Sequence, residues 1–501
     1  MRQGAPADTG QFAVRSKRAA SATVELTPTR LVSVLIPDQP RTGTDHFAAV
    51  CIAGILTDVL AIRLFAARSG LAAFHISFPQ AVVRPGARPV DTLCTRNLYS
   101  ATAAAVLLSL GAARLPAQTS DESSPAPSNV PGAMSPSIHS DGRVTFTLRA
   151  PEAHSIQVAG GDGLGKGPFP MTKGADGTWS VTISHPVPGF HYYWFILDGV
   201  SVNDPGSETY NGYSKEISGI EIPEPGGDFY AVKSVPHGEV RERWYLSRIT
   251  GQWRHVLVYT PPGYERSLSR RYPVLILLHG MGEDETGWTR QGKAQFILDN
   301  LIAAGKAQPM IVVMDRGYAV KSAAPQFAIN GDTRLGDLQL YFGTFADIVI
   351  HELIPTIDAS YRTISDRRHR AIAGLSMGGM QTLFIASRHL DEFAYIASLS
   401  AVVLGGSDPD ETLGEDFQRE FDPKTAYDGL FSDAVKFNKR VKLLWLGAGT
   451  EEEMVHAKVG EVADALRRNG VQPVFFESHG TAHEWQTWRR DLYDLAPRLF
   501  R

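Results

Sequence analysis

The sequence predicts an α/β fold with a doubly wound sheet, preceded by a small all-β sandwich. The chain has 501 residues, which is more than one hydrophobic core normally holds. Short stretches of alternating polar and apolar residues fill positions 135–230, whereas strongly apolar runs alternate with helical patterns over positions 235–501. We therefore expect two folded domains with these bounds.

The C-terminal region contains the apolar runs expected of strands that are buried on both faces of a parallel sheet. Five runs are predicted as strands, over residues 272–278, 309–314, 369–373, 441–446 and 471–477. Helical patterns separate them, for example over residues 345–359, 379–388 and 457–469. Because strands and helices alternate along the chain, a doubly wound sheet is expected.

The middle region contains short strands with period-two alternation, over residues 144–149, 155–158, 179–183 and 192–197. Asp-Gly pairs and other Gly and Pro residues separate them at hairpin spacing. Many short strands in one region indicate a β-sandwich. Exposed aromatic side chains could stack on sugars, and the candidates are Trp179, Tyr192, Tyr193 and Trp194. Period-two alternation is expected to place about half of these four in the core.

The N-terminal region differs in composition from the remainder. Residues 1–117 contain 12 Lys and Arg against 6 Asp and Glu, whereas residues 118–501 contain 37 against 47. Residues 93–117 place a basic residue before a small, apolar run that ends in Leu-Pro-Ala, which is the layout of a secretory signal peptide cleaved after Ala117. We expect a secreted or periplasmic protein.

The segments on either side of this signal are predicted to be unstructured. Residues 1–92 are expected to be non-native or disordered upstream sequence, and residues 118–134 a Ser/Pro linker. A buried alanine-rich helix of an N-terminal domain is the alternative for the apolar run, and an Arg-rich transit peptide is another.

Charge and cysteine content exclude several classes of function. A formal net charge of −4 excludes a globally basic nucleic-acid binder. With only Cys51 and Cys94, the chain has neither a disulfide framework nor a zinc site built on cysteine pairs. The apolar run before Ala117 is too short for a stable membrane span, and the interrupted stretch 47–65 is a poor one. No cofactor and no metal are expected, and the sequence does not indicate an oligomeric state.

The strongest chemical motif is Gly374-Leu-Ser376-Met-Gly378-Gly379, which follows a predicted strand and opens a predicted helix. This G-x-S-x-G arrangement is typical of the nucleophile elbow of α/β-hydrolases, where glycines permit a tight turn that presents the serine hydroxyl. The helix N-terminus behind Ser376 favours developing negative charge. Ser376 is therefore the candidate nucleophile.

A serine needs a histidine base, and in α/β-hydrolases the order along the chain is Ser, acid, His. Four histidines follow Ser376: His389, His456, His479 and His483. His483 is preferred over His479 because it lies beside a helix start after a flexible Gly-Thr pair. The acid should follow the strand that ends at Leu446, where Glu451, Glu452 and Glu453 are adjacent. Spacing alone does not choose among them, and Asp408 is a weaker alternative.

The remaining candidates concern the oxyanion hole and the walls of the site. The backbone N–H of Met377 is one expected oxyanion donor, and Met281, or else Gly282, supplies the second from the loop after the first buried strand. His279 is expected to hold this loop by hydrogen bonds. Trp288 and Trp485 are candidates for the substrate wall, and residues 319–337 for an active-site loop.

Together these residues resemble the esterase-D-like α/β-hydrolases of carbohydrate esterase family 1, in particular bacterial feruloyl and acetylxylan esterases. The resemblance extends from about Ser135 to Arg501, and its most specific phrases are 235–245, 258–264, 297–302, 352–355, 373–379 and 480–488. It implies Ser376 and His483 as catalytic residues, metal-free hydrolysis through an acyl-enzyme, and, from the turn Gly449-Thr-Glu-Glu452, Glu452 as the acid. The middle region resembles immunoglobulin-like, family-48 carbohydrate-binding modules.

The resemblance therefore implies a secreted serine esterase that acts on feruloylated or acetylated xylan or its oligosaccharides. Three alternatives stay open at this point. Siderophore esterases also join an immunoglobulin-like module to this hydrolase, a further relative is an acyl transferase with sugar acceptors, and the chain could be a non-catalytic glycan-binding protein. The complete Ser, acid, His order argues against the last of these.

Overall fold

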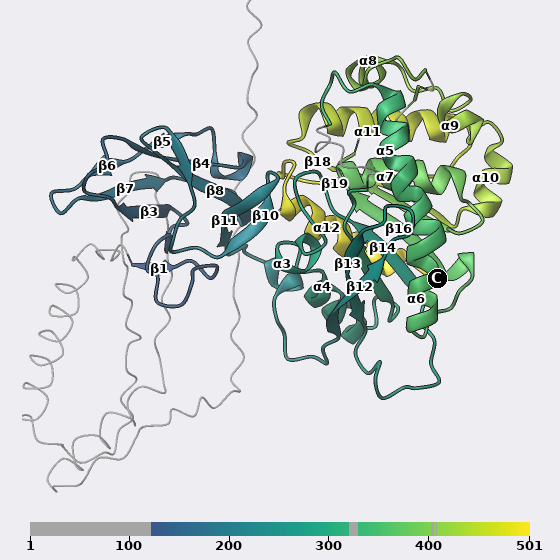
Figure 1. Cartoon of the computed structure of the whole chain (residues 1–501), viewed down its shortest axis with the longest axis horizontal. Coiled ribbons are helices and arrows are strands. Elements are labelled where there is room, and N and C mark those ends of the chain that lie inside the picture. Colours follow the sequence, from purple (N-terminus) through teal and green to yellow (C-terminus); the bar gives the residue numbers. More distant parts are fainter. Residues whose placement is uncertain (1–121, 320–328, 402–404, 407) are drawn as a thin grey trace, which may run out of the picture. The chain divides into compact units, whose positions relative to one another are not determined.

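The computed structural model describes residues 122–319, 329–401, 405–406 and 408–501. These residues belong to one compact unit, Leu115–Arg501. The predicted upstream segment 1–92 and the predicted signal peptide 93–117 lie outside the described residues. Within the described part, an all-β sandwich is followed by a three-layer α/β domain (Figure 1).

The sandwich consists of two antiparallel sheets. The first has the order β1 (Ser123–Pro125), β2 (Ser137–His139), β3 (Val144–Arg149), β7 (Thr178–Ile183) and β6 (Thr172–Lys173). The second has the order β10 (Thr209–Gly212), β11 (Lys215–Ile222), β8 (Gly189–Leu197), β4 (Ile156–Gly160) and β5 (Phe169–Pro170), with β9 (Val200–Val202) also on β8. Inward-facing residues of both sheets, among them Phe146, Tyr193 and Phe195, form its core. This arrangement follows from the period-two alternation of the sequence.

One detail of the sandwich differs from the sequence prediction, and a second agrees with the expectation that about half of the aromatics are in the core. Part of the predicted linker 118–134 is packed, because β1 pairs with β2 and Ala126 is buried in the core. The Ser/Pro composition concealed this short edge strand. Of the four candidate sugar-stacking aromatics, Trp179 and Tyr193 are buried.

The α/β domain is built on an eight-stranded sheet with the order β12-β13-β15-β14-β16-β17-β18-β19. The strands are β12 (Glu239–Leu246), β13 (Trp253–Thr260), β14 (Val274–Leu278), β15 (Ile311–Asp315), β16 (Arg370–Leu375), β17 (Tyr395–Leu399), β18 (Leu443–Gly449) and β19 (Val474–Ser478). β12 and β13 are antiparallel, and β14 to β19 pair in parallel. All five predicted strands are present, and the α/β-hydrolase sheet is confirmed.

Helices cover both faces of this sheet. The α-helices are α3 (Gly287–Arg290), α4 (Ala294–Ala303), α5 (Leu335–Ile348), α6 (Ile354–Ser360), α7 (Met377–Arg388), α8 (Leu413–Gln418), α9 (Ala426–Gly429), α10 (Ala434–Arg440), α11 (Glu453–Arg468) and α12 (Trp485–Leu495). A π-helical turn, η3 (Val349–Leu353), joins α5 to α6, and short 3₁₀ turns lie at η1 (Asp162–Leu164), η2 (Gly227–Tyr230), η4 (Arg367–His369) and η5 (Ala496–Arg498).

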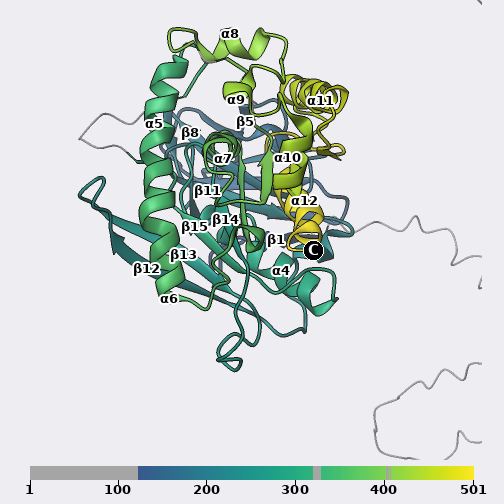
Figure 2. The ribbon, with the colours of Figure 1, turned by 90° about the vertical axis from the view of Figure 1, so that its right-hand side faces the viewer.

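Alternate residues of each central strand enter different cores. In β14, Val274 and Ile276 pack with α5, α7 and α11, whereas Leu275 and Leu277 pack with α4 and α12. Figure 2 shows α5 and α12 on opposite sides of β14. The helix predicted over 345–359 begins ten residues earlier, so the end of the predicted loop 319–337 is helical. By length and composition, the helical stretch Leu335–Ser360 could cross a membrane, but 56% of its apolar window is buried in the protein.

Candidate active site

The nucleophile elbow between β16 and α7 has the geometry that the motif predicts. Ser376 has φ 51° and ψ −119°, a strained conformation that lifts its hydroxyl above the sheet. A Cβ on Gly374 would lie 2.4 Å from the Gly378 backbone, and one on Gly378 would lie 2.5 Å from the His279 carbonyl oxygen. These two positions therefore require glycine.

Ser376, His483 and Glu452 are brought together at the carboxyl edge of the sheet, from the segments after β16, β19 and β18. His483 Nε2 lies 3.0 Å from Ser376 Oγ, and His483 Nδ1 lies 2.9 Å from Glu452 Oε2. The second Glu452 oxygen accepts hydrogen bonds from the Ser400 hydroxyl (2.6 Å) and the Gly449 N–H (2.8 Å). This carboxylate is therefore fixed in position and oriented toward the imidazole.

The competing candidates lie elsewhere. Glu451 and Glu453 are exposed, whereas Glu452 is buried. His456 pairs with Glu477 at 2.9 Å, and His479 is exposed in the turn after β19. Asp408 is exposed in the loop before α8.

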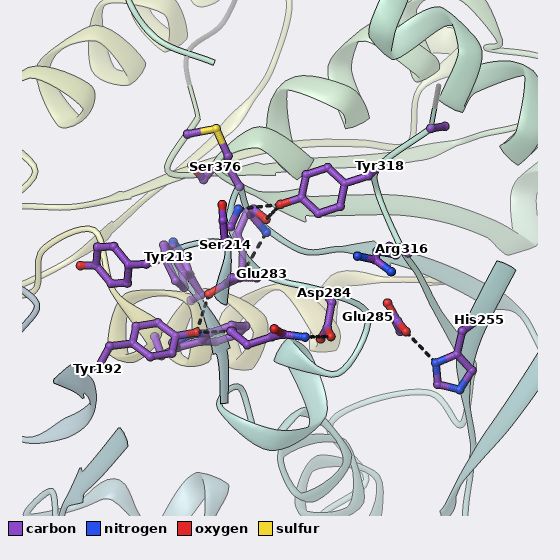
Figure 3. A pocket seen from close by; sticks show the side chains of 18 of the residues that line it. Tyr192, Tyr213, Ser214, His255, Glu283, Asp284, Glu285, Arg316, Tyr318 and Ser376 are labelled. Atoms are coloured by element: carbon purple, nitrogen blue, oxygen red, sulfur yellow. Dashed lines mark hydrogen bonds and ion pairs between the residues drawn. The ribbon is translucent and has the colours of Figure 1, made fainter. Parts of the chain in front are cut away.

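The two alternatives for the second oxyanion donor are distinguished by Tyr318. The Gly282 N–H donates to the Tyr318 hydroxyl at 2.5 Å (Figure 3), so this amide already has a partner. The Met281 N–H donates to no residue in the described part of the chain, and Met377 begins α7, where a backbone N–H has no intrahelical acceptor. The structure thus favours Met281 over Gly282 as the partner of Met377.

The oxyanion loop is the segment 279–282 after β14, and His279 holds it by hydrogen bonds, as expected from the sequence. Its Nδ1 donates to the Gly280 carbonyl oxygen at 2.7 Å, and its Nε2 accepts from the Gly317 N–H at 2.8 Å. Burial lowers the pKa of His279 to about 4, so the ring is neutral and can donate through one nitrogen while it accepts through the other.

A cavity of about 930 Å³ opens above Ser376 and His483. Trp485 contributes to its lining, together with Trp488, Tyr318 and Met281. Trp288 does not line it: this side chain is 1% exposed, and its Nε1 donates to the Leu278 carbonyl oxygen. The assignment of Trp288 to the substrate wall is therefore wrong, because the helix that carries it turns the indole into the core.

The sandwich contributes directly to this pocket, through Tyr213 and Ser214, which the sequence did not single out, and through Tyr192, which it listed only as a sugar-stacking candidate. Tyr213 and Ser214, between β10 and β11, line it, and the Ser214 N–H donates to the Gly282 carbonyl oxygen at 2.9 Å. The Tyr192 hydroxyl donates to Glu283 Oε1 at 3.0 Å and accepts from Trp485 Nε1 at 3.1 Å (Figure 3). A strand of the sandwich is thus bonded both to the oxyanion loop and to α12.

One buried ion pair and two more exposed ones reinforce this junction. The guanidinium of Arg489 in α12 is fully buried and binds both oxygens of Glu221 in β11, at 2.7 and 2.8 Å. Arg490 pairs with Glu224, and Arg290 with Glu208. Breaking a buried pair by removing one partner is strongly destabilising, so the sandwich is held to the hydrolase domain by more than apolar contact.

A second buried network holds the pocket wall after β15. Asp315 accepts hydrogen bonds from the Tyr245 hydroxyl (2.7 Å) and from Arg254 Nη2 (3.1 Å). Arg254 also donates to the carbonyl oxygen of Tyr318 at 2.9 Å. Among the described residues, no group of three or more His, Cys, Asp or Glu side chains is placed to hold a metal ion.

Comparison with known proteins assigns the family. Residues 247–499, about half of the chain, match the family model described as "Putative esterase". The chain belongs to this esterase family. The match covers every segment that carries Ser376, Glu452, His483 and the oxyanion loop.

Two curated relatives and one solved structure are similar to this chain. The chain is 38% identical over 383 residues (75% of the chain, 47% of the relative) to an endo-1,4-beta-xylanase/feruloyl esterase of Xylanibacter ruminicola. It is 27% identical over 310 residues (59% and 26%) to endo-1,4-beta-xylanase Y of Acetivibrio thermocellus. The chain spans less than half the length of each of these relatives.

The enterobactin esterase FES of Shigella flexneri is similar in fold. It is 17% identical, with a TM-score of 0.51, over 71% of this chain and 92% of that one.

Replacement of Glu452 tests which glutamate serves the esterase site. In Glu452→Gln, the Gln oxygen can keep the bonds from Ser400 and Gly449, so that its NH₂ faces His483 Nδ1 and imposes the wrong imidazole tautomer. We expect kcat for p-nitrophenyl acetate to fall by roughly 10³–10⁴-fold with the fold retained. Glu451→Gln and Glu453→Gln serve as matched controls. A comparable loss in either control, with Glu452→Gln active, would overturn the assignment.

The pH dependence of stability tests the environment of Glu283, which is buried beneath the oxyanion loop. Burial raises its pKa from the ordinary value of 4.5 to about 7, so between these values the folded protein binds the proton more tightly than the unfolded chain. The free energy of unfolding should therefore fall as pH rises from 4.5 through 7, by about 3 kcal/mol in total.

Glu283→Gln removes this contribution. Melting temperatures measured from pH 5 to 8.5 should show wild type losing stability relative to Glu283→Gln as pH rises, whereas the surface control Glu451→Gln should follow wild type. A difference between wild type and Glu283→Gln that stays constant with pH would contradict the prediction.

Proposed function

We propose that the protein is a serine esterase that hydrolyses feruloyl esters on plant cell-wall polysaccharide. The observation that carries this proposal is the Glu452–His483–Ser376 relay at the base of a large cavity, in a chain 38% identical to a xylanase/feruloyl esterase. The hydrogen-bonded triad accounts for ester hydrolysis in general, and the size and lining of the cavity favour an aromatic acyl group in the substrate. Its volume of about 930 Å³ and its lining by Tyr318, Trp488 and Met281 suit a hydroxycinnamoyl group better than an acetyl group.

The proposed reaction proceeds in two steps. His483 Nε2 takes the Ser376 proton while Oγ bonds to the ester carbonyl carbon, and the backbone N–H groups of Met377 and Met281 stabilise the oxyanion. Collapse of this intermediate breaks the bond to the sugar oxygen, which takes the proton from His483. Water then attacks the acyl-enzyme with His483 as base, the Ser376–acyl bond breaks, and the carboxylic acid is released as Ser376 regains its proton.

The sandwich is proposed to shape the pocket rim rather than to bind glycan independently. Two of its candidate aromatics are buried, and the Tyr192 hydroxyl is bonded to Glu283. Tyr213 and Ser214 line the pocket.

Turnover of methyl ferulate tests the proposed activity. The full chain should release ferulate, and Ser376→Ala should lower kcat by at least about 10⁴-fold, because no other group can form the acyl-enzyme. Unchanged turnover by Ser376→Ala would refute the nucleophile. Hydrolysis of p-nitrophenyl acetate without any release of ferulate would refute the proposed acyl specificity and favour an acetyl esterase.

We also propose that the chain is exported and cleaved after Ala117, which would leave a secreted or periplasmic enzyme without cysteine. The composition of residues 93–117 supports this proposal. N-terminal sequencing of the exported protein should find a first residue near Gln118, and a mature start before residue 90 would overturn it.

A further inference from the structure

Two exposed tryptophans lie on one face of the β12–β13 hairpin. Trp244 pairs with His255 across the hairpin, and Trp253 pairs with Leu246 two positions further along the ladder. Because neighbouring cross-strand pairs two residues apart point to the same side, both indoles project from one face. Trp244 is 59% exposed and Trp253 is 65% exposed. The other six tryptophans are buried or half-buried.

Trp244 is held in place rather than left free. Its ring stacks on the His255 imidazole, with centroids 4.5 Å apart and planes 27° apart. His255 Nδ1 in turn lies 2.6 Å from Glu285 Oε1 (Figure 3), and both of these side chains are largely buried. Trp244 therefore has one ring face fixed against His255, while the side chain remains exposed to solvent. Because the ring is already ordered, less side-chain conformational entropy is lost when a ligand binds.

The two tryptophans belong to the same cavity as the nucleophile. Trp244, Trp253 and His255 line it together with Ser376 and His483. In Figure 3, His255, Glu285 and Arg316 lie on the side of the pocket opposite Tyr192 and Tyr213. The cavity thus joins a catalytic end at Ser376 and His483 to a solvent-exposed aromatic end on the hairpin.

The chemistry of the exposed end selects the ligand. An indole face offers an apolar, polarisable surface, which suits the C–H face of a neutral sugar ring, whereas the sugar hydroxyls at the ring edge can stay in water. An exposed apolar patch continuous with a catalytic pocket marks a ligand groove more often than an accident of sequence. An ester that reacts at Ser376 has to extend its alcohol portion out of the pocket, and the hairpin provides a surface for that portion.

We propose that Trp244 and Trp253 form a stacking platform for the sugar rings of the polysaccharide that carries the ester. The platform rests on the proposed function, because it takes the glycan to be the alcohol portion of the substrate. It deepens that function by assigning polysaccharide recognition to the hydrolase domain itself. The expected occupant is a neutral oligosaccharide of xylose units.

Binding and turnover separate this proposal from the proposed function. Xylohexaose, which has no ester, should bind the wild-type chain in a calorimetric titration, and Trp244→Ala/Trp253→Ala should weaken binding by about tenfold or more, the loss expected from two stacking contacts. The ratio of kcat/KM for a feruloylated arabinoxylo-oligosaccharide to kcat/KM for methyl ferulate should fall by a similar factor. Trp244→Phe/Trp253→Phe, which keeps aromatic faces, should retain most of this ratio.

Leu268→Ala is the control, since Leu268 is 73% exposed and does not line the cavity. Absence of xylohexaose binding by wild type, or equal binding by the double Ala variant, would overturn the platform. An equal loss on both esters, with an unchanged ratio, would also overturn it. If wild type binds xylohexaose through the two tryptophans but releases no ferulate from either ester, the platform stands and the proposed feruloyl esterase function fails.

Discussion

The close approach of α7 to the sheet is the constraint on which the site depends. Positions 374 and 378 have no room for a Cβ, because the start of α7 lies against the end of β16 and against the loop after β14. Contact at this distance fixes the Ser376 hydroxyl above the sheet and places the oxyanion loop beside it. Parallel pairing of β16 through β19 then brings Glu452 and His483 to the same edge. The catalytic geometry is thus a consequence of backbone packing.

Buried polar contacts extend this arrangement into the sandwich. Tyr192 bonds to Glu283, the Ser214 N–H bonds to the carbonyl of Gly282, and Glu221 neutralises the buried Arg489. Each contact joins the sandwich to a segment that carries part of the site, namely the oxyanion loop or α12. Because unpaired buried polar groups are costly, the two domains stabilise each other's polar surfaces. Removal of the sandwich would expose or unpair groups next to the catalytic residues, so the hydrolase domain is not an independent unit in the energetic sense.

The parts of the site that could be predicted from the sequence are those fixed by local chain geometry. Ser376 was predictable because a strand, a glycine-rich turn and a helix are contiguous in the chain, and His483 because it follows the last strand. The three adjacent glutamates could not be ranked by spacing. The choice depends on the hydrogen bonds from Ser400 and Gly449 that hold the Glu452 carboxylate, and Ser400 lies 52 positions away in the sequence. Trp288 was misassigned because the direction of its side chain depends on the packing of α3. The roles of Tyr192, Glu283 and Tyr318 depend on contacts between distant segments, which no local pattern records.

The two ends of the cavity differ in the solvent exposure of the side chains that line them. At the catalytic end, the supporting side chains Trp485 and Glu283 are 1% and 7% exposed, whereas the Met281 residue is 44% exposed and the His483 side chain 41% exposed. The groups that hold the site in shape are therefore buried, and those that meet the substrate are open to solvent. At the hairpin end, Trp244 and Trp253 are more than half exposed, so a group bound there remains partly hydrated. Hydrolysis requires the alcohol to leave before water can attack the acyl-enzyme, and an exposed alcohol end allows departure without disturbing the fixed donors around Ser376. In the proposed reaction, Tyr318 and Trp488, which line the cavity, are available to hold the acyl group during that exchange. The open hairpin end of the cavity is therefore compatible with the proposed two-step hydrolysis, in which the alcohol leaves first.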